Sequence, residues 1–259
     1  MRLSPLGPLD ALAAPPPDPA RVAFLKAQPF AHRGLHGNGI VENSRAAFSA
    51  AVALGHGIEL DVQPAQGGEP FVFHDARLER LTGDSGALAA RAASELDRIR
   101  LKGSDETIPR LSDILSLVAG RAPILIEVKI DSHHVGHLCL GVRRALEGYR
   151  GDYAVMSFNP EVGRWFRTHA PRIVRGLVVT EHGPETRAQR LRARAERHLS
   201  LWRAKPDFLA YDIRDLPSRF AGAQRERGLP VLTWTVRTAE QERTASACAD
   251  EAIYERPAP

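Results

Sequence analysis

The chain has 259 residues, of which 25% are charged and 43% are hydrophobic, and its formal net charge is +4 at pH 7. This composition is typical of a folded globular protein and excludes a disordered or collagen-like chain. No apolar run reaches the roughly 18 residues that would span a bilayer. The two cysteines, Cys139 and Cys248, are too few for a disulfide scaffold or a cysteine-rich zinc module. The small basic excess suits an anionic substrate and gives no argument for nucleic acid as a partner.

Residues 1–28 are rich in Pro and Ala, and prolines such as Pro5 and Pro8 interrupt their short apolar stretches. A signal peptide needs an unbroken apolar region of roughly 7–15 residues. We therefore interpret this segment as the N-terminal arm of a cytoplasmic protein. A degenerate export signal that ends near residue 14 is the alternative.

From residue 29 onward, short apolar runs alternate with longer helical patterns. The runs are rich in Val, Ile, Leu or Phe, as is typical of strands that are buried on both faces. We predict strands over residues 29–32, 57–63, 123–130, 153–157, 175–180, 207–211, 230–236 and 252–254. Helical patterns include residues 44–54, 160–169 and 239–249, with Ser44 and Thr238 as predicted N-caps.

Eight strands with intervening helices predict an α/β protein with a TIM (β/α)₈ barrel in a single domain over residues 29–257. A doubly wound open sheet is the alternative. Residues 64–110 interrupt the alternation with a predicted hairpin and a long excursion. We interpret them as a small insertion after the second strand, at the mouth of the barrel.

Polar residues stand where the apolar strands end, which is where the catalytic groups of a barrel lie. They are His32, Arg33, Glu59, Asp61, His74, Glu127 and Lys129. Because residues two apart on a strand point to the same side, Glu59 is paired with Asp61, and Glu127 with Lys129. If these pairs point into the barrel, three carboxylates and an ammonium group converge at its mouth.

Three clustered carboxylates are costly unless a cation joins them. Oxygen ligands favour a hard divalent ion, Mg²⁺ or Ca²⁺, over zinc. Lys129 and Arg33 would face this site and suit a phosphate, and His32 and His74 can exchange protons near neutral pH. A metal, two cationic groups and two histidines indicate the cleavage of a phosphodiester.

The ordered set of motifs resembles the glycerophosphodiester phosphodiesterase family. The matching elements are His32-Arg33-Gly34, Glu42-Asn43-Ser44, Glu59-x-Asp61, His74-Asp75, Glu127-x-Lys129 and Trp234-Thr235-Val236. The match runs from about residue 29 to 257, and the excursion after His74 is similar to the insertion that distinguishes this family from phosphoinositide phospholipases C. The resemblance implies a TIM-barrel enzyme that hydrolyses small glycerophosphodiesters to glycerol 3-phosphate and an alcohol.

The resemblance also implies a role for each matched residue. His32 and His74 would be the general acid and base, in an order that the sequence leaves open. The metal ligands would be Glu59, Asp61 and Glu127, with Mg²⁺ or Ca²⁺ as the ion and Mn²⁺ as an alternative. The phosphate and substrate contacts would be Arg33, Lys129, Trp234 and Phe158, together with Glu42, which would either contact the site directly or orient Arg33. Members often end the last strand with Thr-Asp, where this chain has Tyr254 and Glu255.

Two other functions are compatible with the sequence. The first is an intracellular lipid or lysolipid headgroup hydrolase of the same family, in which insertion leucines form a lid. These leucines are Leu78, Leu81, Leu88 and Leu96. The second is a non-catalytic barrel that binds phosphate metabolites, and it ranks last because none of the proposed metal or proton-transfer residues is missing.

Residues 185–205 are rich in arginine and carry apolar residues at helical spacing. We predict an outer barrel helix that packs its apolar stripe inward. The stripe consists of Ala188, Leu191, Ala195, Leu199 and Trp202. Weak association with a membrane surface is the alternative. The oligomeric state is left open by the sequence.

Overall fold

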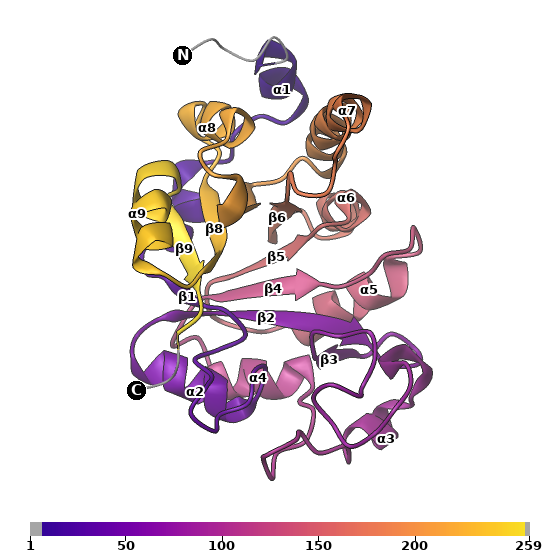
Figure 1. The fold of residues 1–259 in the computed structure, drawn as a ribbon. Helices are drawn as coiled ribbons and strands as arrows, with labels where there is room; N and C mark the ends of the chain where they lie inside the picture. Colours follow the sequence, from indigo (N-terminus) through magenta and orange to yellow (C-terminus); the bar gives the residue numbers. More distant parts are fainter. Residues whose placement is uncertain (1–6, 257–259) are drawn as a thin grey trace. The chain divides into compact units, whose positions relative to one another are not determined.

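The computed structural model describes residues 7–256 (Figure 1). Residues 1–6 of the predicted arm and Pro257, the last residue of the predicted barrel domain, lie outside the described residues. The described chain forms two compact units. One contains residues 30–153 together with 255 and 256, and the other contains residues 7–29 together with 154–254.

The unit of residues 30–153 is built on strands that place the conspicuous polar residues. They are β1 (Phe30–Ala31), β2 (Gly57–Pro64), β3 (Pro70–Val72) and β4 (Ile124–Val128). Strand β2 runs parallel to β1 and β4 and antiparallel to β3. The register aligns Asp61 of β2 with Glu127 of β4, so their carboxylates come from neighbouring strands at the same level.

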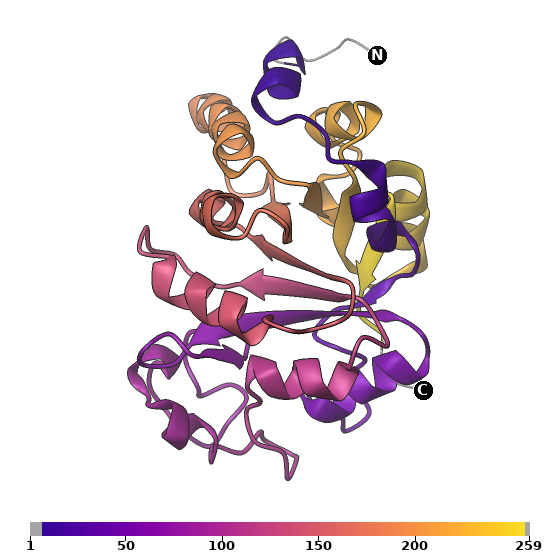
Figure 2. The ribbon, with the colours of Figure 1, turned by 180° about the vertical axis from the view of Figure 1, so that it is seen from behind.

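The helices of this unit are α2 (Arg45–Ala53), α3 (Ala93–Leu96), α4 (Leu111–Val118) and α5 (Gly136–Ala145), with a short 3₁₀ turn η2 (Leu88–Ala90). Helices α4 and α5 lie side by side (Figure 2). Ser44 caps α2 as predicted, since its hydroxyl accepts a hydrogen bond of 3.1 Å from the Ala47 amide.

The insertion after β2 has a small hydrophobic core of its own. Leu78, Leu88 and Leu96 are fully buried and pack with Phe71 and Phe73. Their burial does not support the alternative in which the insertion leucines form a lid. They hold the insertion together because a segment of this length needs its own buried apolar surface to stay ordered.

The other unit is a series of parallel strands with helices between them. The strands are β5 (Tyr153–Ser157), β6 (Val174–Val179), β7 (Phe208–Asp212), β8 (Val231–Val236) and β9 (Glu251–Tyr254). Each is parallel to the next in the chain. The helices are α1 (Gly7–Ala13), α6 (Pro160–His169), α7 (Arg187–Ala204), α8 (Arg219–Glu226) and α9 (Ala239–Cys248), with 3₁₀ turns η1 (Pro19–Lys26) and η3 (Ile213–Asp215). All eight predicted strands are present, with ends within one or two residues of those expected.

The inward stripe predicted for α7 is wrong. Leu191 and Leu199 are 61% and 57% exposed, Ala188 and Ala195 are exposed as well, and Trp202 is half-buried. The buried side is carried instead by His198, Leu201 and Ala204 near the end of the helix. Residues 187–192 are all exposed, so the first turns of α7 bury none of their side chains.

Between residues 7 and 256 no helix, α7 included, combines the length and apolar character that crossing a bilayer requires.

Helix α1 lies near α7 and α8 of its unit (Figure 1), and a buried carboxylate joins the three helices. Asp10 is fully buried, and its oxygens lie 2.8 Å from His198 Nδ1, 2.8 Å from Trp202 Nε1 and 2.9 Å from Gln224 Nε2. The residues come from α1, α7 and α8. One side chain near the N-terminus thus joins two helices that are far away in the sequence.

We expect Asp10→Ala to lower the free energy of unfolding by about 3–5 kcal/mol, because it leaves the buried partners of the carboxylate unsatisfied. Urea unfolding followed by circular dichroism measures this change. The matched control is Asp105→Ala, whose side chain is fully exposed and whose removal should cost less than about 0.5 kcal/mol. Equal unfolding midpoints for the two variants would contradict the role of Asp10.

Candidate active site

Three buried carboxylates form the centre of the site. One oxygen from each of Glu59, Asp61 and Glu127 lies within 4.8 Å of the others, and the three residues are 1%, 1% and 8% exposed. Glu59 and Asp61 alternate with Leu60 on β2, and the β2–β4 register brings Glu127 opposite Asp61. The structure thus brings together the three residues that the sequence analysis grouped as metal ligands.

Two cations lie against these carboxylates. Lys129 Nζ is 3.1 Å from Asp61 Oδ1 and 2.8 Å from Glu127 Oε1. Arg33 Nε is 3.3 Å from Asp61 Oδ2, and the backbone amide of Arg33 donates a 3.0 Å hydrogen bond to Glu59 Oε2. Asp61 therefore lies between both predicted phosphate-binding residues.

Burial and charge move the pKa values of the three acids in different directions. Burial raises the pKa of Glu59 well above its usual range, and the charges of Asp61 and Glu127 act in the same direction. Burial also raises the pKa of Glu127, against the opposing charge of Lys129. Burial alone would raise the pKa of Asp61, but Lys129 and Arg33 outweigh it and hold this pKa well below its usual range.

This donor set fits a hard divalent cation. With all three carboxylates ionised, two positive side chains would leave one negative charge uncompensated, and the same repulsion contributes to the raised pKa of Glu59. Glu127 Oε1 is buried and makes no well-aligned hydrogen bond. All the donors are carboxylate oxygens, the ligands of Mg²⁺, Ca²⁺ and Mn²⁺. A cation in this cluster would compensate that charge.

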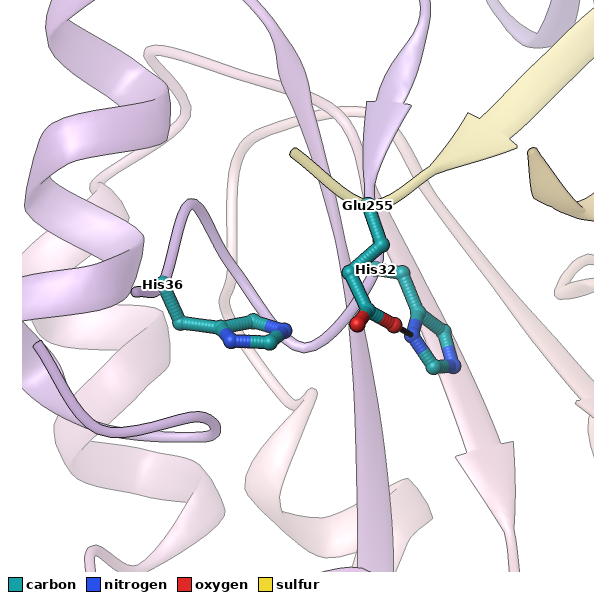
Figure 3. Close-up of side chains that lie close together, drawn as sticks. All are labelled: His32, His36 and Glu255. Atoms are coloured by element: carbon teal, nitrogen blue, oxygen red, sulfur yellow. Dashed lines mark hydrogen bonds and ion pairs between the residues drawn. The ribbon is translucent and has the colours of Figure 1, made fainter. Parts of the chain in front are cut away.

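The first predicted histidine has a carboxylate partner. His32 follows β1, and its Nδ1 lies 3.1 Å from Glu255 Oε2, just after β9 (Figure 3). Burial lowers the pKa of His32, while the hydrogen bond and the charge of Glu255 raise it in part. With Nδ1 bonded to Glu255, Nε2 is the nitrogen left for exchange with a substrate.

The second predicted histidine is held in the same manner. His74 follows β3, and its Nδ1 lies 2.6 Å from Asp75 Oδ1. Its carbonyl accepts a 2.9 Å hydrogen bond from Gln63 Nε2 at the end of β2. Burial lowers the pKa of His74 as well, against the opposing charge of Asp61. The charges of both imidazoles, His32 and His74, lower the pKa of Asp61.

A chain of ion pairs connects Arg33 to His74. Glu42 accepts hydrogen bonds from Arg33 Nη1 at 2.8 Å and from Arg80 Nη1 and Nη2 at 3.0 and 2.8 Å. Arg80 Nε in turn donates to Asp75 Oδ2 at 2.5 Å. Glu42 therefore holds the Arg33 guanidinium by an ion pair. Whether it contacts the substrate site directly or only orients Arg33 stays a prediction.

A pocket of about 800 Å³ opens on this side of the unit. Its lining includes His74, Arg80 and Lys129. A cavity of this size with convergent cationic groups is typical of a site for a small anionic ligand.

The backbone at Arg33 is held in an unfavourable conformation. Its φ is +55°, in the left-handed region that costs a residue with a side chain about 1–3 kcal/mol. The turn is closed by a 3.1 Å hydrogen bond from Gly34 N to Ala31 O. In this conformation the Arg33 amide donates its 3.0 Å hydrogen bond to Glu59.

The two predicted aromatic contacts belong to the other unit. Phe158 follows β5 and Trp234 lies in β8, and their rings pack edge to face with centroids 5.6 Å apart. Trp234 Nε1 also donates a 3.0 Å hydrogen bond to Ala210 O. Their role as an apolar wall for the substrate stays a prediction.

Four residues of the site were not among the predicted contacts. Asp75 and Glu255 bond to the two histidines, Arg80 joins Glu42 to Asp75, and Asn43 Nδ2 donates to Asp61 Oδ2 at 3.0 Å. Asp75 and Asn43 stand within the quoted motifs, and Glu255 was noted as a departure from the family pattern. Arg80 lies inside the insertion, and no sequence pattern marks it.

The model of a family described as the glycerophosphoryl diester phosphodiesterase family matches residues 32–258. A glycerophosphodiester phosphodiesterase of Caldanaerobacter subterraneus subsp. tengcongensis is 29% identical, over 90% of this chain and 96% of that protein. Another, of Bacillus altitudinis, is 39% identical over 40% of this chain and spans 44% of that protein's length.

Solved structures resemble the chain over most of its length. A phosphodiesterase of Oleispira antarctica, in complex with the product sn-glycerol-3-phosphate, matches with a TM-score of 0.76 and 20% identity over 90% of this chain and 94% of that one. A putative glycerophosphoryl diester phosphodiesterase of Silicibacter pomeroyi matches with a TM-score of 0.72 and 21% identity over 92% and 94%. This likeness confirms the predicted (β/α)₈ barrel fold.

Proposed function

The chain belongs to the glycerophosphoryl diester phosphodiesterase family, and on that premise we propose that it hydrolyses glycerophosphodiesters to glycerol 3-phosphate and an alcohol. The observation that carries the proposal is the buried cluster of Glu59, Asp61 and Glu127, contacted by Arg33 and Lys129. A cluster of this charge has no structural purpose that an apolar core would not serve better. It is explained by a reaction that needs concentrated charge.

Arg33 and Lys129 bind the phosphate in this proposal. Both already contact Asp61, which keeps the two positive groups a short distance apart and reduces the side-chain freedom that binding would remove. The ion pairs of Glu42 with Arg33 and Arg80 fix the guanidinium of Arg33 further. The phosphoryl oxygens therefore meet a positively charged surface that is formed in advance.

His32 and His74 move the protons. One accepts a proton from the attacking water or hydroxyl, and the other donates a proton to the leaving alkoxide. Each has Nδ1 bonded to a carboxylate, Glu255 or Asp75, which leaves Nε2 for the reaction. Burial lowers the pKa of both histidines. The histidine that serves as the acid must carry a proton, so the negative charge of the bound phosphate must raise its pKa.

The carboxylate cluster would hold a divalent cation, Mg²⁺ or Ca²⁺ with Mn²⁺ as the alternative. When bound, such an ion supplies positive charge that stabilises the phosphoryl oxygens in the transition state. Glu59, Asp61 and Glu127 are the residues that would ligate it, and Asn43 orients Asp61 through its 3.0 Å hydrogen bond.

A panel of substrates tests the proposal. Purified protein with Mg²⁺, Ca²⁺ or Mn²⁺ is incubated with glycerophosphocholine, glycerophosphoethanolamine and glycerophosphoglycerol, and release of glycerol 3-phosphate is measured. We expect turnover of at least one diester and none of a phosphomonoester. Lack of turnover across the panel would contradict the proposal and favour a barrel that only binds phosphate metabolites.

The lipid alternative needs its own arm of the panel. The burial of Leu78, Leu88 and Leu96 argues against a leucine lid, whereas Leu191 and Leu199, exposed on the arginine-rich helix α7, support weak association with an anionic membrane surface. Lysophosphatidylcholine presented in anionic vesicles is compared with soluble glycerophosphocholine. Faster turnover of the lysolipid would establish the lipid hydrolase. The cytoplasmic location stays a prediction of the sequence.

Removing the charge of Glu255 should shift the pH dependence of the reaction. The Glu255 carboxylate raises the pKa of His32, so Glu255→Gln should lower that pKa. Whether His32 acts as the base, which sets the acidic limb of kcat/KM, or as the acid, which sets the alkaline limb, its limb should move to lower pH. Glu69→Gln, a partly exposed control, should leave both limbs in place. A uniform loss of rate with unmoved limbs would mean that Glu255 is structural.

A further inference from the structure

A second group of side chains that could ligate a metal includes His32, and its donor atoms differ from those of the carboxylate cluster. It consists of His32 after β1, His36 in the following loop and Glu255 after β9, and one donor atom from each lies within 4.8 Å of the others. Figure 3 shows the imidazole of His36 pointing toward the carboxylate that bonds to His32. Two imidazoles and one carboxylate therefore face the same small space.

We propose that His32, His36 and Glu255 form a separate site for a borderline-soft divalent ion such as Zn²⁺. Two imidazole nitrogens and a carboxylate oxygen are a common donor set for zinc, with the fourth position left to water. Mg²⁺ and Ca²⁺ prefer oxygen ligands and would stay with Glu59, Asp61 and Glu127. The two sites thus differ in the kind of ion that they select.

The loop that carries His36 is fixed before any ion binds. Leu35 N donates to Ala47 O at 2.9 Å, and Gly37 and Ile40 exchange backbone hydrogen bonds of 2.9 and 3.0 Å. Gly34 packs so closely on Ala47 that a Cβ at this position would lie 2.8 Å from it. Hydrogen bonds therefore fix the backbone on both sides of His36, as a preorganised ligand requires.

Solvent can reach the cluster, since the side chains of His32 and Glu255 are 12% and 28% exposed. The small distance between Nδ1 of His32 and Oε2 of Glu255, 3.1 Å, is bridged by one proton. A zinc ion can replace this proton, because ligand atoms about 2 Å from the ion lie little farther apart than the nitrogen and oxygen do here. The nearby charge of Arg33 opposes a second cation, so the affinity depends on all three ligands.

The consequence for activity rests on the proposed function. An ion bound to one nitrogen of His32 leaves the other nitrogen protonated, so the ring can no longer accept a proton there or return to the imidazolium form. Zinc at this site would therefore inhibit an enzyme that is saturated with Mg²⁺. His36 has no part in the proposed reaction. Its substitution therefore distinguishes zinc bound at this site from zinc bound at the carboxylate cluster.

Direct binding tests the site without reference to turnover. Full-length protein in saturating Mg²⁺ is titrated with Co²⁺, and the visible absorption of the bound ion is recorded. We expect one Co²⁺ per chain with the intense bands of a four-coordinate site, displaced by one equivalent of Zn²⁺. His36→Ala and Glu255→Gln should lose these bands, and His134→Ala, an exposed loop histidine, should keep them. Bands that persist in His36→Ala would overturn the proposal.

Inhibition is the second measurement. We expect the concentration of Zn²⁺ that halves turnover to rise at least tenfold in His36→Ala, with turnover in Mg²⁺ alone unchanged. If zinc inhibits the wild type and His36→Ala equally, it acts at the carboxylate cluster and the proposal is overturned. His36→Gln serves as a second variant should His36→Ala fold poorly. A wild type that binds Co²⁺ but hydrolyses no diester would contradict the proposed function and leave the metal site intact.

Discussion

Alanine substitution of His32 or His74 is expected to lower kcat for a glycerophosphodiester by about 10²–10⁴-fold, the contribution of a positioned general acid or base. Both side chains lie at the edge of the site and are partly exposed, so we expect neither variant to unfold. Steady-state kinetics with circular dichroism measures both effects. His169→Ala, an exposed histidine at the end of α6, should keep full activity.

A change of leaving group assigns the two roles. A nitrophenyl diester releases a phenolate that needs no protonation, so the variant that lacks the general acid should recover most of its rate on this substrate. The variant that lacks the base should stay slow on both substrates. Two variants that retain at least a tenth of the wild-type rate on the natural diester would contradict the proposed chemistry.

The strands were predictable because each is an apolar run with polar residues at its ends. The same pattern was sufficient to group Glu59 with Asp61 and Glu127 with Lys129, since period-two alternation fixes which side chains share a face. The meeting of the two pairs depends on the register that aligns Asp61 with Glu127. The alternation of strands and helices predicted a barrel but left a doubly wound open sheet as the alternative, so the local pattern alone did not fix the order of the strands.

Contacts between segments that are distant in sequence were the part that could not be predicted. Arg80 reaches Glu42 and Asp75 from within the insertion, and the fold of an irregular segment follows from its own core rather than from any periodicity. Asp10 likewise bonds to His198 and Trp202, some 190 positions away, and nothing near it in the sequence marks it. Such pairs are determined by tertiary packing.

The α7 helix shows a different limit. Its apolar residues do recur at helical spacing, so the helix itself was predicted, but periodicity says nothing about how far the partner surface extends. Leu191 and Leu199 are exposed although they belong to the apolar pattern, whereas Leu201 is buried. A pattern over 18 residues cannot be assigned as a whole to one buried face.

The carboxylate cluster should be essential for activity and unfavourable for stability. We expect chelation to abolish turnover and Asp61→Asn or Glu59→Gln to reduce it by more than about 10²-fold, because loss even of residues that only orient metal ligands costs 10–100-fold. Readdition of Mg²⁺, Ca²⁺ or Mn²⁺ should restore the wild type alone. Glu69→Gln, a partly exposed control, should behave as the wild type in every respect.

Although Glu59→Gln should lower activity, it should not lower the folding stability of the metal-free protein. In metal-free protein, burial raises the pKa of Glu59 well above its usual value of 4.5, so the folded state holds a proton that the unfolded state releases. Folding stability should therefore fall as the pH rises from about 4.5 through the raised pKa. Glutamine carries no charge there, so the variant should lose this decline and unfold at the same or a higher temperature than the metal-free wild type at pH 8. A marked destabilisation at pH 8 would mean that the ionised Glu59 supports the fold, and the cluster would then be structural rather than a site kept for a cation.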